Sequence, residues 1–561
     1  MESYQDKPWT KSYKLGPFKL AETIEYPEEP LFTVLDDTAK KFPGKDAFIY
    51  LGKGMKYKDL LSNVNKMANA LVKLGVSKGK GIMVVLPTSP QFIICDFAIL
   101  KTGAFLIPCS LLLKADELIH QAQESKAETI ICLDSHVDLI NSIKDKTSLK
   151  NIIITAVTDF SDFESNDVKE IDGTHNLKNL ITQSKTEPPE VDISPKDDLA
   201  ILAFTGGSTG VPKGVMLTHF QRRANISQGL PWMMAPLPNL QGSASSLLAV
   251  PIFHAFGHYL MQASIAWGIR ILLIPDPRDI KLIVQLMNEY RPMLIFMVPT
   301  QIMKLTEPDV EIKRMPVMIM SGAAALPQEV ALKLEQKTKM PISEGYGLTE
   351  TGPCTHINIT AFGKITRFSP KTVPGIGLPI PDTEVKLVDP ETLDEVPFGD
   401  VGELWIRGPQ VMKGYWPDAG SGLEKDGWLR TGDLGKMDKE FYFHIVDRIK
   451  DMINVSGMKV YSIEIDEVLF KHPAVLGAVA IGLPDPDRPG SERIKAFIKL
   501  RESYKDKIKA DDIIDFCREK LAPYAVPKFI EFRDDLPQTV TEKLFKRALR
   551  EEEIKKMENE G

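Results

Sequence analysis

The chain has 561 residues, of which 43% are hydrophobic and 26% are charged, and its formal net charge is −7. These values are ordinary for a globular protein and exclude a mainly disordered, collagenous or coiled-coil chain. They also argue against a protein that follows nucleic-acid phosphates, because such proteins usually carry a basic surplus. We therefore expect about three or four domains or subdomains, small-molecule partners and no nucleic acid.

The cysteines and the apolar stretches indicate a protein of the cell interior. The five cysteines are widely spaced and form no C-x-x-C pair, which argues against a disulfide scaffold or a structural zinc site. The first 16 residues lack the apolar core of a secretory signal. Residues 257–275 are apolar but contain Trp267 and Arg270, so we expect a buried helix and strand there rather than a membrane span. The expected location is the cytoplasm, and peripheral membrane contact stays open.

Predicted strands and helices alternate along the first part of the chain. The first 30 residues are polar and are expected to lie over a surface. Residues 58–74 place their apolar side chains on one helical face, and the all-apolar run 82–87 is typical of a buried parallel strand. Further strands are expected at 105–109, 128–133 and 151–157, and helices at 92–104 and 115–125. This order predicts a mainly parallel sheet covered by helices on both faces.

A second set of strands follows the polar segment 158–195, which we interpret as a linker or surface excursion. These strands are predicted at 199–204, 247–251, 270–275, 294–299 and 317–320. Several of them end in loops of unusual composition, among them TGGSTG, PIFHAFGH and SGAAAL. Ligands collect at the carboxyl ends of strands in open α/β sheets, so we expect the functional site at these loops.

Two changes of pattern predict the domain organisation. After residue 380 the strands become short and are separated by glycine turns, and from about residue 450 the chain is charged and mixes helices with strands. We predict an α/β fold with a large N-terminal domain, residues 1–449, of wound, mainly parallel sheets plus a β-rich subdomain. Its subregions are 1–195, 196–380 and 381–449. A small α+β C-terminal domain covers residues 450–561.

The segment FTGGSTGVPKG, residues 204–214, is the strongest local signal for a binding site. Its glycines let backbone N–H groups approach an anion, its hydroxyl residues add donors and Lys213 adds a positive charge. The segment is not a Walker A motif, because Val211 and Pro212 separate Lys213 from the preceding glycine. A P-loop kinase or ATPase is therefore disfavoured, and a glycine-rich hairpin without a ligand is the plain alternative.

The string TGGSTGVPKG resembles the signature TSGTTGxPKG of the adenylate-forming enzymes, which include acyl-CoA synthetases, firefly luciferase and the adenylation domains of peptide synthetases. Further elements resemble that family in the same order. They are PIFHAFGH (251–258), SGAAALP (321–327), EGYGLTETG (344–352), GELWIRGPQVMKGYW (402–416), DGWLRTGDLG (426–435), FHIVDRIKDMINVSGMKVYSIEID (443–466) and LPQTVTEKLFKRALR (536–550). The resemblance covers almost the whole chain and is strongest to medium- and long-chain fatty acid–CoA ligases.

The resemblance implies a two-step reaction that uses ATP, Mg²⁺ and coenzyme A. A carboxylate attacks the α-phosphate of ATP, pyrophosphate leaves, and the thiol of coenzyme A then attacks the acyl-adenylate and releases AMP. A fatty acid is the expected substrate of a monomer or homodimer. Two alternatives stay open: an aryl-acid CoA ligase similar to 4-coumarate ligases, and a nucleotide- or acyl-binding sensor with weak catalysis.

The resemblance also assigns roles to residues. Tyr346 would stack on adenine, Asp433 would accept both ribose hydroxyls, and Thr349 would contact the α-phosphate. Glu350, together with Thr205, would bind magnesium, whereas a solvated helix cap is the plain interpretation of that glutamate. The full nucleotide set is Thr205, Gly206, Gly207, Ser208, Thr209, Gly210, Lys213, Ala323, Ala324, Gly345, Tyr346, Gly347, Asp433 and Arg448.

The C-terminal domain would supply the residue that moves most during the reaction. Lys543 matches the family lysine that bridges the acyl carboxylate and the α-phosphate. Lys450 matches a hinge about which the small domain would rotate, bringing Gly457 to the thiol tunnel. The chain departs from the family pattern at Glu542, where the family has Gly, at Ser462 for Pro and at Asp466 for Glu, and in a loop, residues 484–497, that is two residues longer. A glutamate next to Lys543 predicts weaker adenylation and keeps the sensor alternative open.

The acyl pocket is the part of the site with the fewest sequence signals. Gly347 stands where short-chain acetyl-CoA synthetases have a tryptophan, which implies an open pocket. His254 and Phe256 are expected in its wall, with His254 also near the substrate carboxylate, although a buried core histidine is the plain alternative. Trp232 is a candidate gate for a fatty-acid tunnel.

Overall fold

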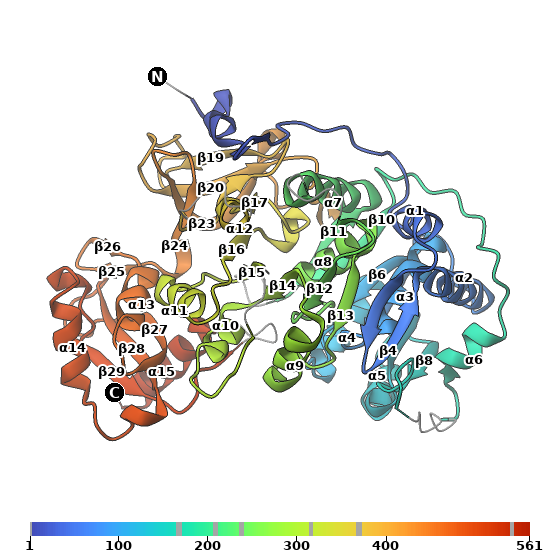
Figure 1. The fold of residues 1–561 in the computed structure, drawn as a ribbon. Coiled ribbons are helices and arrows are strands. Elements are labelled where there is room, and N and C mark those ends of the chain that lie inside the picture. Colours follow the sequence, from blue (N-terminus) through green and yellow to red (C-terminus); the bar gives the residue numbers. More distant parts are fainter. Residues whose placement is uncertain are drawn as a thin grey trace.

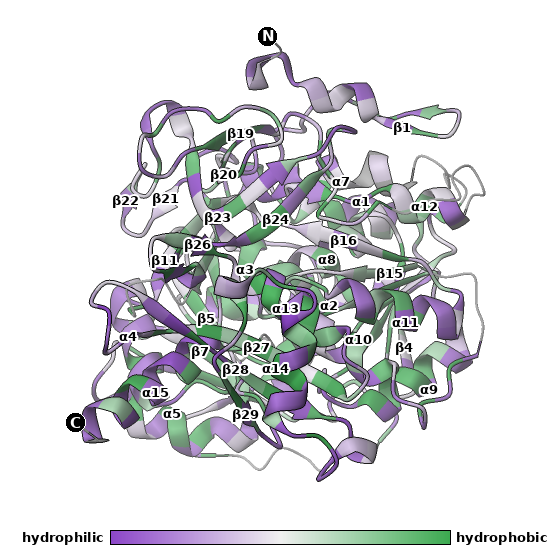
Figure 2. Ribbon diagram, turned by 90° about the vertical axis from the view of Figure 1, so that its left-hand side faces the viewer, coloured by the Kyte–Doolittle hydropathy of each residue, from purple (hydrophilic) through white to green (hydrophobic). Residues whose placement is uncertain are grey.

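The computed structural model describes residues 3–163, 171–205, 211–234, 240–313, 318–365, 373–538 and 544–560. Two large sheets and the helices around them form the body of the protein, and a smaller unit follows at the C-terminus (Figure 1). Hydrophobic residues concentrate in the interior strands, whereas the outer helices carry hydrophilic residues (Figure 2). The predicted α/β class is confirmed.

The first sheet has nine strands within the described residues, and its central strands are parallel. In spatial order they are β22 (Asp418–Ala419), β21 (Gly414–Tyr415), β11 (Lys213–Thr218), β10 (Leu199–Thr205), β6 (Phe105–Pro108), β5 (Gly81–Val85), β7 (Thr129–Leu133), β8 (Asn151–Thr155) and β9 (His175–Asn176). The strands β10, β11, β21 and β22 pair antiparallel with one another. The edge next to the predicted phosphate loop is therefore antiparallel.

The second sheet also has nine strands in the described part of the chain. They are β18 (Leu378–Pro379), β17 (His356–Ile357), β16 (Ile342–Tyr346), β15 (Met318–Ser321), β14 (Leu294–Met297), β12 (Ser245–Leu248), β13 (Arg270–Leu273), β3 (Asp46–Tyr50) and β4 (Lys53–Lys56). The sheets do not follow the sequence ranges that we predicted as subregions, because β3 and β4 join the second sheet and β21 and β22 return to the first.

The helices cover these sheets and fill the space between them. They are α1 (Thr33–Lys41), α2 (Tyr57–Lys73), α3 (Pro90–Lys101), α4 (Ala115–Ser125), α5 (Val137–Lys144), α6 (Leu177–Thr182), α7 (His219–Met234), α8 (Ala255–Ala266), α9 (Ile280–Tyr290), α10 (Pro299–Leu305), α11 (Gln328–Thr338) and α12 (Thr360–Ile365). Helix α3 is buried on every side, as its sequence FIICDFAIL predicts. No helix among the described residues is long and apolar enough to span a bilayer.

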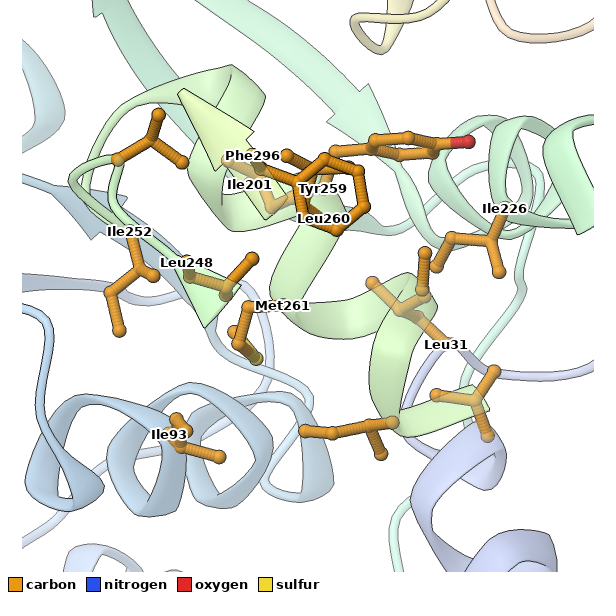
Figure 3. Close-up of a cluster of buried hydrophobic side chains, with 14 of the residues drawn as sticks. Leu31, Ile93, Ile201, Ile226, Leu248, Ile252, Tyr259, Leu260, Met261 and Phe296 are labelled. Carbon is orange, nitrogen blue, oxygen red and sulfur yellow. The ribbon is translucent and has the colours of Figure 1, made fainter. Parts of the chain in front are cut away.

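The main core joins the two sheets through three helices. Figure 3 shows Ile93 of α3, Ile226 of α7 and Met261 of α8 gathered with Ile201 of the first sheet and Phe296 of the second. These side chains are almost fully buried, and burial of a side chain of this size contributes about 1.5–3 kcal/mol. Helix α7 contacts the backbone after Glu350 and α8 begins directly after the predicted residue His254, so the core fixes the position of these two parts of the site.

A four-stranded antiparallel sheet and a C-terminal unit complete the fold. The four strands are β19 (Glu384–Val388), β20 (Gly402–Arg407), β23 (Leu429–Met437) and β24 (Phe443–Arg448). The C-terminal unit contains β25 (Ile453–Val455), β26 (Met458–Val460), α13 (Ser462–Phe470), β27 (Val475–Pro484), β28 (Glu492–Leu500), α14 (Ala510–Arg518), β29 (Phe529–Phe532) and α15 (Lys546–Glu560).

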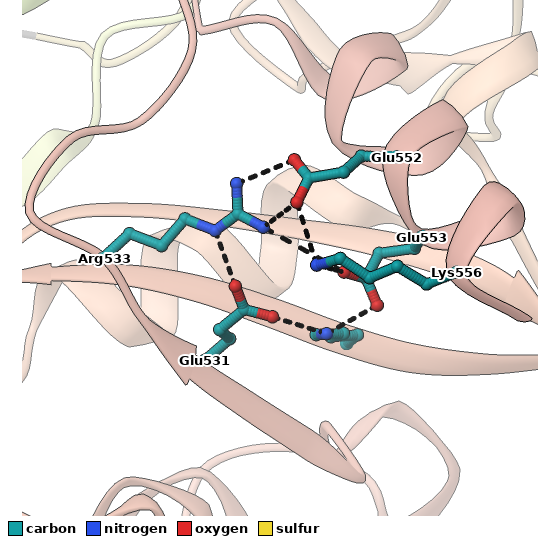
Figure 4. Close-up of polar contacts among 6 residues, drawn as sticks. Glu531, Arg533, Glu552, Glu553 and Lys556 are labelled. Carbon is teal, nitrogen blue, oxygen red and sulfur yellow. Dashed lines mark hydrogen bonds and ion pairs between the residues drawn. The ribbon is translucent and has the colours of Figure 1, made fainter. Parts of the chain in front are cut away.

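An ion-pair network attaches the last helix, α15, to the sheet of the C-terminal unit (Figure 4). The Arg533 guanidinium donates to both carboxylate oxygens of Glu552, over 2.7 and 2.9 Å, and also to Glu531. These donors and Lys556 lower the pKa of Glu552 to about 2. The helix that follows the predicted catalytic lysine in sequence is thus held in place by charge as well as by packing.

The N-terminal segment differs from the prediction, because its aromatic residues are buried rather than laid over a surface. The indole of Trp9 meets Phe443 edge-on, and the ring of Tyr13 meets Trp232 at 4.7 Å between centroids. We call residues 3–31 the N-terminal arm. The segment 158–195, predicted as a linker, also contains a short strand and a helix, β9 and α6.

Candidate active site

The ends of the predicted phosphate loop form a β-hairpin. Strand β10 ends at Thr205 and β11 begins at Lys213, and these two residues face each other across the ladder. Thr205 therefore lies at the carboxyl end of β10, where ligands bind in such sheets. The predicted residues Gly206, Gly207, Ser208, Thr209 and Gly210 lie outside the described residues.

Tyr415 connects this hairpin to Glu350. The ammonium of Lys213 lies 5.1 Å from the centre of the Tyr415 ring, and the Tyr415 hydroxyl donates to Glu350 Oε1 over 2.9 Å. Glu350 lies in a short helix, Thr349–Thr351, whose position is set by a hydrogen bond from the Met412 backbone to the Glu350 carbonyl. The structure therefore brings Lys213, Thr349 and Glu350 together, and Glu350 is more than a solvated cap.

Tyr346, Asp433 and Arg448 form a second polar group. The Tyr346 hydroxyl donates to Asp433 Oδ2 over 2.6 Å, and Arg448 Nε donates to Asp433 Oδ1 over 3.1 Å. Burial raises the pKa of Tyr346, and the Asp433 carboxylate raises the pKa of Arg448. A carboxylate has about four acceptor positions, so Asp433 keeps acceptor capacity for two further hydroxyl donors.

The predicted adenine loop follows β15 and adopts an unusual backbone conformation. Ala323 has a positive φ of 72°, and Ala324 is exposed. Gly322 approaches Phe256 so closely that a Cβ on the glycine would lie 2.8 Å from the ring. Phe256, predicted in the acyl pocket, therefore contacts the adenine loop directly, and the two predicted subsites are adjacent.

The remaining acyl-pocket residues occupy different environments. His254 caps helix α8, where its Nδ1 accepts the Phe256 backbone N–H over 3.4 Å. A Cβ at Gly347 would collide with the Pro353 carbonyl oxygen, so backbone packing alone requires glycine there. Trp232 is fully buried against the N-terminal arm and its indole N–H donates to the Ala21 carbonyl over 3.1 Å. These contacts give Trp232 a packing role that the sequence did not indicate.

Two departures from the family pattern meet in one buried cluster beside the predicted hinge. The Ser462 backbone N–H and hydroxyl both donate to Asp447, which lies on β24. Lys546 donates to the Ser462 hydroxyl over 2.6 Å and to Asp466 over 2.8 Å. Proline has no N–H to donate, so serine provides a contact that the family residue cannot make. We call Asp447, Ser462, Asp466 and Lys546 the hinge cluster.

The other predicted residues of the C-terminal unit have few contacts with the site. Lys450 is exposed in a short helix, Ile449–Asp451, directly after β24. Gly457 is exposed at the turn between β25 and β26, where its φ is 85°. Lys543 and Glu542 lie outside the described residues. The unit contacts the large domain through an ion pair between Arg501 and Glu307 and through Glu467, which accepts the Gln328 backbone N–H.

The donor set suits a magnesium ion held mainly by a substrate. Among the described residues there is no group of three or more His, Cys, Asp or Glu side chains that could hold a metal. Mg²⁺ commonly uses one or two carboxylates together with substrate phosphates and water. Glu350, next to the phosphate hairpin, fits that arrangement.

Glu344 provides a pH-dependent prediction for this region. It begins the EGYGLTETG element on β16, and burial, with a contribution from Glu467, raises its pKa from 4.5 to about 7. Because the folded state holds this proton more tightly than the unfolded chain, its contribution to stability is lost as the pH rises from about 4.5 through about 7. Glu344→Gln is expected to raise the melting temperature at pH 8 and to have little effect at pH 4. An equal shift at both pH values would contradict this explanation.

Sequence reasoning missed two groups that organise the site. Tyr415 lies within the quoted GYW string but received no role, although an aromatic residue in so specific a motif is a usable signal. The second group is on helix α7, directly after the phosphate hairpin. There the Asn225 side chain donates to the Cys354 carbonyl and accepts the Cys354 N–H, and Gln221 donates to the Val411 carbonyl. Helix α7 thus holds the backbone shortly after Glu350 and shortly before Tyr415.

Comparisons with known proteins identify the family of this chain. The family description AMP-binding enzyme matches residues 35–416, and AMP-binding enzyme C-terminal domain matches residues 464–543. A long-chain-fatty-acid–CoA ligase of Bacillus subtilis (strain 168) is 35% identical over an alignment 572 positions long, with 98% of each chain covered.

Two solved structures share the fold over nearly the whole chain. The structure of the anthranilate CoA ligase AuaEII with anthranoyl-AMP has a TM-score of 0.81 at 25% identity, and it covers 94% of this chain and 98% of its own. ATP-bound MatB from Rhodopseudomonas palustris has a TM-score of 0.80 at 25% identity, with 93% and 99% covered. The resemblance found in the sequence motifs is confirmed: the chain belongs to the AMP-binding enzyme family.

Proposed function

We propose that this protein is an ATP-dependent, AMP-forming acyl-CoA ligase whose substrate is a medium- or long-chain fatty acid. The observation that carries the proposal is the convergence of Lys213, Glu350 and Tyr415 beside the phosphate hairpin. The group that Asp433 of β23 forms with Tyr346 of β16 and Arg448 of β24 adds the expected ribose and adenine contacts. The identity to long-chain-fatty-acid–CoA ligases over 98% of the chain supports the choice of acid.

In the first step, an oxygen of the fatty acid carboxylate attacks the α-phosphorus of ATP. The bond from that phosphorus to the bridging oxygen breaks, and pyrophosphate leaves with the electron pair. Asp433 would accept hydrogen bonds from the ribose hydroxyls, and Tyr346 would stack on the adenine. Lys213 would neutralise negative charge on the departing phosphates. Fixed cations and donors of this kind stabilise a phosphoryl-transfer transition state mainly by position and charge.

Magnesium and Lys543 would complete the charge balance of this step. Magnesium, when bound, neutralises phosphate charge, and Glu350 with Thr205 would hold it. Lys543 would bridge the acyl carboxylate and the α-phosphate, as in the family motif that it matches. The site needs no protein nucleophile, because the substrate carboxylate is itself the nucleophile.

In the second step, the thiolate of coenzyme A, formed when its thiol loses a proton to solvent, attacks the acyl carbon, and AMP leaves as the acyl C–O bond breaks. We propose that the C-terminal unit turns about Lys450 between the steps, withdrawing Lys543 and presenting the hairpin that contains Gly457. One cavity would then serve both half-reactions, as in other enzymes whose domains close and reopen during turnover.

An aryl-acid CoA ligase is the second candidate. It is favoured by the likeness to the anthranilate CoA ligase at 25% identity over 94% of this chain. Phe256 next to the adenine loop could border either an aromatic ring or an alkyl chain, so the pocket wall does not favour one acid over the other.

The experiment measures pyrophosphate release with ATP, magnesium and a panel of octanoic to octadecanoic acids and aromatic acids, with and without coenzyme A. Release with straight-chain acids that continues only when coenzyme A is present is the expected result. Release with aromatic acids alone would move the assignment to the second candidate. Bound ATP without release for any acid would favour a sensor, and the variant Glu542→Gly would then show whether that residue suppresses adenylation.

A further inference from the structure

Three polar side chains from three helices meet inside the main core. Asp96 of α3, Arg222 of α7 and His258 of α8 are 0%, 1% and 1% exposed. The same three helices also carry apolar side chains of the main core, as Figure 3 shows for Ile93, Ile226 and Met261. Removing a charge from water costs several kcal/mol unless it is paired, so this arrangement requires an explanation.

The contacts between these side chains define the state of each group. Arg222 Nη2 lies 3.3 Å from His258 Nδ1, and His258 Nε2 lies 3.1 Å from Asp96 Oδ2. Guanidinium can only donate, so Nδ1 must accept and the proton of a neutral imidazole must be on Nε2, facing the carboxylate. Burial also lowers the pKa of His258. The histidine is therefore a neutral bridge between one positive and one negative charge.

Arg222, the positively charged member of this group, contacts the backbone next to Thr349 and Glu350. Arg222 Nη1 donates to the carbonyl oxygen of Gly352, the residue that directly follows the short helix Thr349–Thr351. Asn225, one turn further along α7, holds the backbone of Cys354. Two side chains of one helix therefore fix the chain immediately after Thr349 and Glu350. At the other end, Gln262 donates to Asp96 Oδ2 over 2.8 Å and orients that carboxylate.

We propose that Asp96, His258 and Arg222 form a buried positioning relay that sets the place of Thr349 and Glu350 relative to the bound nucleotide. Arg222 is the positioning residue. The Asp96 carboxylate balances the charge of the Arg222 guanidinium through the imidazole of His258, which lies between them. This inference rests on the proposed function, since it assigns the relay to the nucleotide subsite of that reaction. None of the three residues touches the reacting atoms.

The alternative is that the charges only balance each other within the core. Two variants separate the possibilities. Arg222→Met removes the donor to Gly352 but leaves Asp96 unpaired, so it is expected to lower both stability and activity. The double variant Asp96→Asn with Arg222→Met removes both charges, and replacing a whole buried pair is often tolerated. Arg223→Met is the matched control, because Arg223 lies on the same helix but pairs with Glu29 of the N-terminal arm, 2.7 Å away.

Each variant is measured by thermal unfolding, by acid-dependent ATP–pyrophosphate exchange and by calorimetric titration with MgATP. We expect the double variant to recover most of the melting temperature, while the kcat of exchange stays about 10-fold to 100-fold below wild type, the effect of a displaced reacting group. The KM for the acid should be unchanged, and MgATP should bind more weakly. Arg223→Met should keep wild-type exchange.

Recovery of both stability and kcat in the double variant would overturn the relay. If the wild-type chain binds MgATP but activates no acid, the proposed function fails, and the relay is still decided by the calorimetry. Equal MgATP affinity in wild type and double variant would then refute it. A wild-type chain that does not bind MgATP would refute both proposals.

Discussion

Replacing Lys543 with methionine is expected to lower the rate of acyl-adenylate formation about 10²-fold to 10³-fold, the scale of a removed transition-state donor. The melting temperature should not change, because the proposed role is to bridge two substrate groups. Transfer from a preformed acyl-adenylate to coenzyme A should keep its wild-type rate. The two half-reactions are measured separately, by pyrophosphate release and by thioester formation from synthetic acyl-adenylate.

Lys546, three residues after Lys543, provides a control variant for which we expect a loss of stability rather than a loss of one half-reaction. Its ammonium is held by Ser462 and Asp466 in the hinge cluster. Lys546→Met leaves buried carboxylates without their cation, which typically destabilises by about 3–5 kcal/mol. The expected outcome is a lower melting temperature with both half-reactions affected alike. If Lys543→Met behaved in the same way, Lys543 would be structural and the motif match would have misled us.

Replacing Asp433 with asparagine is expected to raise the KM for ATP about 10-fold to 100-fold, since hydrogen bonds to a charged group contribute about 1.5–3 kcal/mol. An amide presents one acceptor oxygen where the carboxylate presents two, and it no longer balances the Arg448 guanidinium. The KM for the acid should change little. Initial rates at varied ATP and fixed acid give the measurement.

Tyr346→Phe is the matched variant for this second prediction. It removes the hydroxyl that donates to Asp433 but keeps the ring that would bound the adenine. We expect a loss in ATP affinity of less than about 10-fold, the size of one neutral donor. A larger effect from Tyr346→Phe than from Asp433→Asn would mean that Asp433 serves to hold the tyrosine, and the ribose assignment would fall.

The parts of the fold that could be predicted are those that the sequence encodes locally. All-apolar runs such as 82–87 must be buried on both faces and therefore become central parallel strands. The strings around Lys213 and Glu350 could be recognised because each is short and continuous, so that residues adjacent in the sequence carry the whole signal. These features needed no knowledge of distant contacts.

The parts that could not be predicted depend on pairs far apart in the chain. Nothing near Trp9 indicates that it packs on Phe443, and a polar segment with scattered aromatic residues predicts a surface. The partnership of Asp96 with His258 is equally distant, although a lone carboxylate within FIICDFAIL could have marked a buried polar contact. The packing of Trp232 could not be predicted for the same reason, because its partners Tyr13 and Ala21 lie in the N-terminal arm.

The N-terminal arm has a consequence for shortened forms of this protein. The family match begins at residue 35, so a chain trimmed to that boundary would look complete by motif. It would lack the Leu31 backbone N–H that binds His219 and the Ala21 carbonyl that accepts the Trp232 indole N–H, and both of these partners lie on α7. It would also expose the indole of Trp232. The N-terminal arm supports α7, the helix that holds the active-site backbone. Proteolytic cleavage within the arm would therefore inactivate the enzyme even though every motif residue remained in place.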